Sequence, residues 1–337
     1  MIKRTSLKDI ARKVGVSIAL VSYVLNNQKE GRIGKEIAQK IRDAAAALNY
    51  RPNQIAKSLK TNKTHTIGLI VADISNPFSS TLARIIEDEA DKQGYTVIFG
   101  SSDENELKSG KLIDALLNRQ VDGLIIIPPA GSEDQIIQLQ RQEVPFVLVD
   151  RYFPEIDTNR VILDNYSSTY EAVQHLVAGN CKKIGMITYD ASLFHLQQRK
   201  KGYLAGIAQS KINHNEDLLK EVNIRNDQME IETAIRELLS LHEPIDALLF
   251  STNSLAISGL RYIRSLSIKV PEDLAIIGFD ETEIFDFFYA PLSYIRQPLR
   301  EMGQMAINIL LDDINKMKRT REVVMPAQLV IRKSTMK

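Results

Sequence analysis

The 337-residue chain contains one cysteine, Cys181, and no tryptophan. A single cysteine excludes an internal disulfide framework and a multi-cysteine zinc site, and such a residue is usually a small part of the core. The sequence also has no run of eighteen apolar residues, and its N-terminus, MIKRTSLKDIARKVGVS, is charged and amphipathic where a secretory signal has an apolar core. We therefore expect a cytoplasmic protein without a membrane segment.

The sequence also lacks the motifs of common α/β enzymes. It has no G-x-G-x-x-G after the first expected strand, no G-x-x-x-x-G-K-[ST], no G-x-S-x-G and no H-E-x-x-H. No two histidines have the i, i+4 spacing of a helical metal site. The five are His65, His175, His195, His214 and His242. These absences predict that the protein is not an enzyme and uses no metal or cofactor.

Charge of one sign is concentrated at the N-terminus. Residues 1–62 contain 13 Lys and Arg against 4 Asp and Glu, a net charge of +9, whereas the other 275 residues contain 30 and 38, a net charge of −8. Such a division is expected when only the N-terminal module binds a polyanion. A basic arm for a membrane surface is the alternative, but these residues have the apolar pattern of a folded module.

The first 52 residues predict three helices. Ser6, with Asp9 three residues later, marks a helix start that Gly15 ends, and Ser17 can cap a second helix. The apolar positions of the three helices are Leu7, Ile10, Ala11 and Val14, then Leu20, Val21, Val24 and Leu25, then Ile37, Ile41, Ala44, Ala45 and Leu48. The third helix should stop at NYRP, where Pro52 prevents continuation. This order predicts a helix-turn-helix, although a purely structural helical bundle would have the same pattern.

The outer face of the second helix has a distinctive composition. Its residues are small or polar apart from Ile18 and Tyr23, and the full set is Ile18, Ala19, Ser22, Tyr23 and Asn26. Such a face can enter a DNA major groove and contact base edges and thymine methyl groups. Together with the +9 charge, it predicts DNA binding.

From residue 67 onward, short apolar runs alternate with amphipathic segments. The runs are TIGLIVAD, YTVIFGS, DGLIIIPP, PFVLVDR, KIGMITY, DALLFST and LAIIGFDE. Runs of four to six apolar residues between amphipathic segments indicate parallel strands covered by helices on both faces. We therefore expect a doubly wound α/β architecture, and RVILDNYSS is a candidate crossing between two similar lobes.

Several of these expected strands end in polar residues. They are Asp73, Ser101 and Ser102, Asp150 and Arg151, Asn253, and Asp280. One strand-end aspartate is usually a turn former or a helix cap, but open parallel sheets bind ligands beyond the carboxyl ends of their strands. Several such residues on one rim predict a polar cleft.

Two N-terminal segments, TSLKDIARKVGVSIALVSYVLNN and LNYRPNQIAKSLKT, together with the C-terminal LVIRKST, carry a family resemblance. The chain resembles the lactose-repressor/galactose-repressor family of bacterial transcription regulators over nearly its whole length. The resemblance implies a helix-turn-helix over 1–52, a hinge helix and linker over 53–65, and a periplasmic-binding-protein fold over 66–337. It also implies three crossovers, with an N-lobe over about 66–163 and 294–318 and a C-lobe over about 164–293 and 319–337.

The resemblance assigns DNA-binding positions by residue. Ile18, Ala19 and Tyr23 match base-reading positions, while Ser6, Ser17, Ser22 and Asn26 match positions that hold the backbone or approach phosphates. In the hinge, Ile55, Ala56 and Leu59 share one small face that can pack against a dimer partner, with Leu59 as a wedge in the minor groove and Lys60 near phosphate. The alternative is that Leu59 rests on the core lobe.

The resemblance also suggests effector contacts. Phe78 matches a position that packs on the effector, Arg199 matches a cleft arginine, and Asn253 and Asp280 match polar positions of the opposite lobe. His195 is either a donor to the effector or an ordinary surface or structural histidine. The complete predicted set is Asp73, Phe78, Asp150, Arg151, His195, Arg199, Asn253 and Asp280.

The resulting hypothesis is a homodimeric repressor, or less often an activator, that binds a near-palindromic operator in double-stranded DNA. A small effector in the cleft would control binding. A cleft with Phe, Arg, Asn and Asp suits a sugar or sugar derivative, including a sugar phosphate, and leaves purines open. A periplasmic sugar-binding protein is the other candidate class, but it would need a signal peptide in place of the DNA-binding module.

Overall fold

The computed structural model describes residues 5–26, 32–50, 63–210, 216–223, 228–317 and 320–336. The chain divides into two compact units, Met1–Thr64 and His65–Lys337. Each unit has its own apolar core.

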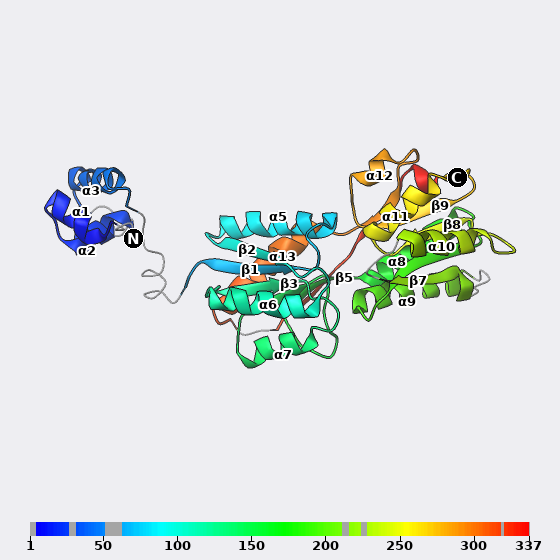
Figure 1. The fold of residues 1–337 in the computed structure, drawn as a ribbon, viewed down its shortest axis with the longest axis horizontal. Coiled ribbons are helices and arrows are strands. Elements are labelled where there is room, and N and C mark those ends of the chain that lie inside the picture. Colours follow the sequence, from blue (N-terminus) through cyan, green and yellow to red (C-terminus); the bar gives the residue numbers. More distant parts are fainter. Residues whose placement is uncertain are drawn as a thin grey trace. The chain divides into compact units, whose positions relative to one another are not determined.

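The first unit contains the three helices expected from the sequence, α1 (Leu7–Val14), α2 (Ile18–Leu25) and α3 (Lys35–Ala47) (Figure 1). Gly15, at φ +77°, ends α1. α3 ends directly before NYRP, where it was expected to stop, because Asn49 takes a φ of +47° and the Tyr50 N–H donates to the Ala45 carbonyl at 2.9 Å. A local turn therefore ends this helix after Ala47, before the proline.

The second unit contains two six-stranded sheets. In the order of their pairing, the first consists of β11 (Glu322–Met325), β5 (Arg160–Leu163), β4 (Phe146–Val149), β3 (Gly123–Ile126), β1 (Thr66–Val71) and β2 (Thr96–Ser101). The second consists of β12 (Gln328–Val330), β10 (Ser293–Arg296), β9 (Ala275–Phe279), β8 (Ala247–Phe250), β6 (Ile184–Asp190) and β7 (Leu219–Asn223). All neighbouring strands are parallel except β10 and β12, which are antiparallel.

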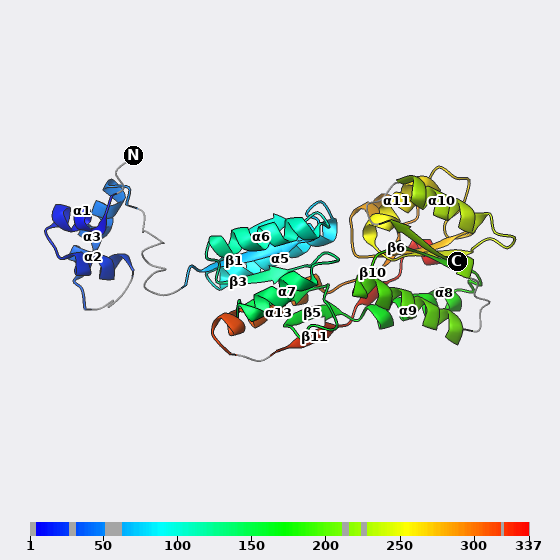
Figure 2. The same ribbon diagram turned by 60° about the horizontal axis from the view of Figure 1, so that its bottom comes forward.

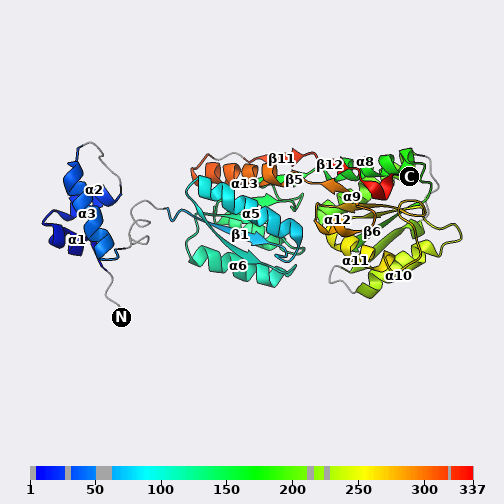
Figure 3. The ribbon, with the colours of Figure 1, turned by 90° about the horizontal axis from the view of Figure 1, so that it is seen from above.

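Helices cover both faces of each sheet (Figure 3). Around the first sheet, α5 (Pro77–Lys92) and α13 (Leu299–Ile314) share one core, and α6 (Glu106–Asn118) and α7 (Glu133–Arg141) share the other. Around the second sheet, α8 (Asn165–Ala178) and α9 (Phe194–Gln209) lie on one face. The other face carries α10 (Gln228–Leu239), α11 (Asn253–Ile263) and α12 (Ile284–Phe287). Cys181 is buried in the core under α8 and α9, as expected.

The chain crosses between the two lobes three times, but two of the expected boundaries were wrong. β10, which contains Tyr294, pairs with β9 in the second lobe, and β11 pairs with β5 in the first lobe (Figure 2). The N-lobe return therefore begins after Arg296 rather than at 294, and it extends to Met325 rather than 318. Each of these strands has four residues, too few for its own pattern to indicate which sheet it joins.

None of the described helices is both long enough and apolar enough to span a bilayer.

Candidate functional site

The α2 helix presents one face outward from the first unit. Ser17 caps it, because its hydroxyl oxygen accepts from the Leu20 N–H at 3.2 Å. Val21 and Val24 are buried in the core of this unit, whereas Ile18 is 48% exposed and Ala19 is exposed. A large apolar side chain on the outside of a basic helical module is available for contact with a partner.

The polar residues predicted to contact DNA also stabilise the helix ends. The Asp9 carboxylate accepts from the Ser6 N–H at 2.9 Å and from the Ser6 hydroxyl at 2.7 Å. The Asn26 side-chain amide donates to the Ser22 carbonyl at 2.8 Å. Tyr23 and Ser22 are half-buried on the same helix. The DNA contacts of these residues stay predictions.

The predicted hinge contacts lie outside the described residues. They are Ile55, Ala56, Leu59 and Lys60, all within 51–62.

In the second unit, polar residues from both lobes meet where the strands of the two sheets end. We call this group the interlobe cluster; it consists of Asn76, Glu104, Asp150, Arg151, Asn165, Arg199, Asn253, Asp280 and Gln297. Asp150 follows β4, Asp280 follows β9 and Gln297 follows β10. The carboxyl ends of parallel strands are the usual ligand-binding edge of such sheets, which explains why the cluster forms here.

The two lobes contact each other directly at the edge of the cluster. The Asn253 side-chain amide donates to Asn76 Oδ1 at 2.8 Å, and Asn76 Nδ2 lies 3.3 Å from Asn253 Oδ1 and 3.4 Å from the Ser254 hydroxyl. Elsewhere, the Tyr152 and Phe194 rings meet edge to face with centroids 5.1 Å apart. The Asn76–Asn253 contact joins the start of α5 to the start of α11.

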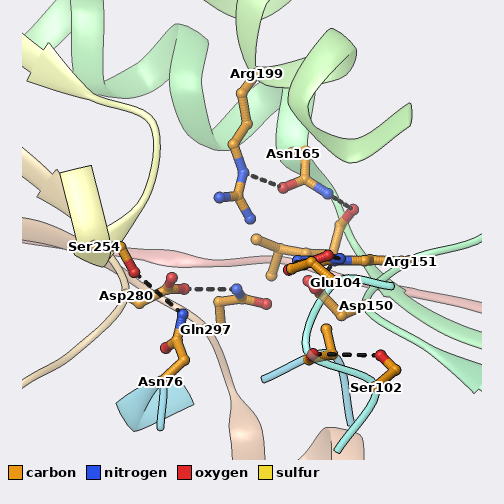
Figure 4. Close-up of polar contacts among 12 residues, drawn as sticks. Asn76, Ser102, Glu104, Asp150, Arg151, Asn165, Arg199, Ser254, Asp280 and Gln297 are labelled. Atoms are coloured by element: carbon orange, nitrogen blue, oxygen red, sulfur yellow. Dashed lines mark hydrogen bonds and ion pairs between the residues drawn. The ribbon is translucent and has the colours of Figure 1, made fainter. Parts of the chain in front are cut away.

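Arg199 is fixed on the C-lobe side and is only 2% exposed. Its Nε donates to Asn165 Oδ1 and its Nη1 to the Ser251 carbonyl, both at 2.7 Å, and its guanidinium carbon lies 3.4 Å from the centre of the Phe279 ring. Figure 4 shows the guanidinium pointing toward Glu104, Asp150 and Arg151. Burial lowers the pKa of Arg199, and the carboxylates of Asp280 and Asp150 oppose that shift.

The N-lobe side of the cluster contains a bidentate ion pair. Arg151 donates from both terminal nitrogens to the carboxylate of Glu104, at 2.7 and 2.8 Å (Figure 4). Beside it, burial raises the pKa of Asp150 to about 6, although Arg199 and Arg151 pull that pKa down. The Asp280 carboxylate accepts from Gln297 Nε2 at 2.7 Å, and burial raises the pKa of Asp280 as well.

His195, left open between a ligand donor and an ordinary histidine, is buried rather than on the surface. It is 4% exposed, and burial lowers its pKa well below the usual value, so the imidazole is neutral at neutral pH. Arg199 and Arg151 contribute to that shift. The influence of these two guanidinium groups on its pKa places His195 close to the cluster.

The side chains of two predicted effector residues do not join the cluster's hydrogen bonds. The Asp73 carboxylate accepts from the N–H of Ser75 at 2.9 Å and from its hydroxyl at 2.8 Å, which is the arrangement of a turn. Phe78 donates its N–H to Asn76 Oδ1, and its ring is buried in the N-lobe core. Asp73 therefore forms the loop before α5, and Phe78 contacts the cluster through its backbone.

Sequence reasoning missed four members of the cluster. They are Asn76, Glu104, Asn165 and Gln297. Gln297 directly follows the short strand β10 and Asn165 comes two residues after the short strand β5, so the strand-end rule would have found them if those strands had been recognised. Glu104 follows Asp103, and both take a positive φ of 54° and 52°, a feature that the sequence does not reveal.

Several buried polar atoms of this region have no hydrogen-bond partner within the described chain. They are Asp150 Oδ1, Arg151 Nε, His195 Nδ1, Ser251 Oγ and Gln297 Oε1. Buried polar atoms are normally paired, so a group of unpaired ones indicates a place for a polar ligand. Among the residues that the structure describes, no group of three or more His, Cys, Asp or Glu side chains could hold a metal ion.

Comparison with known proteins identifies both units. Residues 6–53 match the family model "Bacterial regulatory proteins, lacI family", and residues 173–335 match "Periplasmic binding protein-like domain". The chain is 31% identical to the HTH-type transcriptional regulator DegA of Bacillus subtilis (strain 168), over 98% of both chains. It is 30% identical to the HTH-type transcriptional repressor CytR of Escherichia coli (strain K12), over 98% of this chain and 96% of that one.

A solved structure agrees with this relationship over the whole chain. The lac repressor dimer bound to operator and the anti-inducer ONPF matches with a TM-score of 0.88 and 25% identity, over 99% of this chain and 100% of that one. The fold class, the family and the absence of enzymatic function predicted from the sequence are thereby confirmed. The chain belongs to the lacI family of bacterial regulatory proteins, as a DNA-binding transcription regulator with a periplasmic-binding-protein-like domain.

Proposed function

We propose that the protein is a cytoplasmic repressor that binds a near-palindromic operator as a homodimer and is controlled by a sugar or sugar derivative in the interlobe cluster. The proposed DNA binding rests mainly on the outward face of α2, where Ile18 is 48% exposed. This helix lies in the segment 1–62, which has a net charge of +9. Apolar side chains in this position can contact thymine methyl groups while the surrounding cations bind phosphates.

Exposed apolar residues on both lobes support the homodimer. On the edge strand β2, Phe99 is 60% exposed and Ile98 is also exposed. At α12, Phe287 is 84% exposed, and Ile284 and Tyr289 are exposed beside it. In Figure 1, α12 and α5, which packs beside β2, both lie on the upper side of the second unit. Exposed apolar groups of this size are typical of protein interfaces, and a two-fold dimer matches a two-fold operator.

The interlobe cluster supports control by a small polar effector. Its side chains come from both lobes, and its unpaired buried atoms require donors and acceptors from a ligand. A ligand that contacts both lobes favours one lobe arrangement over another, and this difference can be transmitted to DNA binding.

The test is selection of operator DNA by the full-length protein from a pool of random duplexes, followed by gel-shift titration. We expect an enriched near-palindrome, whose complex dissociates steeply with salt because phosphate contacts release counterions. Tyr23→Ala should reduce the preference for the selected sequence over random DNA, whereas Gln39→Ala, on the exposed side of α3, serves as the control. Failure to enrich any sequence, or enrichment of one without two-fold symmetry, would contradict the proposal.

A further inference from the structure

The charges of the interlobe cluster are not balanced. Two guanidinium groups, those of Arg151 and Arg199, face three carboxylates, those of Glu104, Asp150 and Asp280. The other four groups are the charged side chains that shift the pKa of Asp150. The nearby His195 is neutral. With all three acids ionised, the cluster has a net charge of −1, which repels an anionic ligand in this buried setting.

Both guanidinium groups already bind other groups of the protein. Both terminal nitrogens of Arg151 bind the Glu104 carboxylate, at 2.7 and 2.8 Å. Arg199 donates to Asn165 and to the Ser251 carbonyl while its face covers the Phe279 ring. A phosphate bound by both terminal nitrogens of Arg151 would have to break the contact with Glu104 and leave that carboxylate unpaired, at a cost in affinity.

Three of the helices that begin at the cluster are capped by side chains of the protein. Helix N-termini bind anions through free N–H groups. Here the Asn76 side chain accepts from the first turn of α5, Asp164 accepts from that of α8, and Thr252 accepts from that of α11. The backbone of Asn253 also hydrogen-bonds to the Asp280 carboxylate. In each of these three helices one first-turn N–H group is therefore already bound, which weakens that helix end as an anion site.

Two of the unpaired buried atoms of the cluster require a hydrogen-bond donor. Asp150 Oδ1 and Gln297 Oε1 are buried acceptors without a partner, and Arg151 Nε is a buried donor without one. A phosphate dianion offers acceptors only, whereas a hydroxyl group both donates and accepts. Neighbouring hydroxyls of one ligand can donate to the two acceptors and accept from Arg151.

From these four features we infer that the interlobe cluster selects an uncharged polyhydroxylated ligand and rejects the phosphorylated form of the same ligand. This inference rests on the effector binding proposed above and narrows it, since that proposal includes sugar phosphates. Glu104 is the specificity-determining residue. It binds both terminal nitrogens of Arg151 and contributes the carboxylate that makes the net charge of the cluster negative.

The test uses calorimetric titration of the full-length protein with matched pairs of probes. The neutral members are D-glucose, D-fructose, D-galactose and D-ribose, and their partners are the corresponding 6-phosphates, or the 5-phosphate for ribose. We expect a neutral sugar to bind and its phosphate to bind at least about 100-fold more weakly, the scale of a buried like-charge contact.

A charge-removing variant tests the cause. Glu104→Gln keeps the size of the side chain, releases Arg151 and brings the net charge of the cluster to zero. The ratio of phosphate affinity to neutral-sugar affinity should rise at least about tenfold. Glu106→Gln removes the same charge from an exposed position two residues away and should leave the ratio unchanged.

The outcomes separate this inference from the proposed function. A phosphate that binds as tightly as its neutral partner, or an unchanged ratio in Glu104→Gln, would overturn the inference while sugar binding at the cluster stands. Binding of neither class would overturn both the inference and the proposed effector class.

Discussion

Replacing Asp150 with asparagine should stabilise the ligand-free protein. Asp150 is 5% exposed, its Oδ1 has no hydrogen-bond partner, and its closest cation contact is 3.8 Å, between its Oδ2 and Arg151 Nε. Burial raises the pKa of Asp150 from 3.8 to about 6. At ~1.36 kcal/mol per pKa unit, ionisation of this group at neutral pH costs the folded state at most about 3 kcal/mol. Asparagine removes that cost and loses little hydrogen bonding.

The sign of the pH dependence follows from the raised pKa. Between about pH 4 and pH 6 the folded protein binds the Asp150 proton and the unfolded chain has lost it, so this group lowers stability as pH rises through that window. The advantage of Asp150→Asn should therefore be absent near pH 4 and complete above pH 7, at about 1–3 kcal/mol.

Thermal melting of the full-length protein between pH 4 and pH 8 measures this advantage. At pH 8 we expect the Tm of the variant to exceed that of the wild type by roughly 2–12 °C, given ~2–4 °C per kcal/mol for a domain of this size. Asp157→Asn, at an exposed position of the same lobe, is the control and should leave Tm unchanged. A lower Tm for Asp150→Asn at pH 8, or an advantage that does not change with pH, would refute the reasoning. The variant should also bind the effector poorly, a common cost of stabilising a functional site.

Three further predictions concern the other parts of the protein. Arg199→Ala should abolish the effector response while operator affinity is kept, because this residue contacts the cluster and not DNA; a variant that still responds in a gel-shift assay would mean that the site is misplaced. Leu59→Ala should weaken operator binding by ~1–3 kcal/mol, as for a lost interface contact, with effector affinity unchanged, and equal operator affinity would contradict the wedge role. Phe287→Glu should shift the protein from dimer to monomer in analytical ultracentrifugation, since a charge would then lie in the proposed interface, and an unchanged sedimentation coefficient would argue against α12 as part of it.

The helix-turn-helix could be predicted from the sequence because its signals are local. Caps such as Ser17 and the break at Gly15 act within one turn, and the apolar spacing of Val21 and Val24 directly gives the buried face. The end of α3 was placed correctly at NYRP, but the turn that ends it lies at Asn49, whose positive φ depends on backbone geometry that a proline rule does not describe.

The cluster was predicted only in part, because the strand-end rule depends on recognising the strands. Asp150, Arg151, Asn253 and Asp280 follow long apolar runs, and the structure brings all four together. The same rule selected Asp73, whose carboxylate forms a turn with Ser75 instead. A strand-end aspartate can serve either purpose, and only the tertiary structure shows which neighbours it has.

The contacts between the lobes suggest how the proposed effector would control DNA binding. Beside the cluster, the lobes contact each other through the neutral amide pair Asn76–Asn253, and each such hydrogen bond contributes about 0.5–1.5 kcal/mol net. Several other groups at the junction, among them Asp150, Arg151 and Gln297, are buried and incompletely paired, and a ligand can supply their missing partners. A ligand shifts an equilibrium only by its difference in affinity for the two states. The hydroxyl groups of one ligand can donate to Asp150 and Gln297 at the same time only when both lobes are in place. The hydrogen bonds that would give specificity therefore also supply the free energy that shifts the arrangement of the lobes.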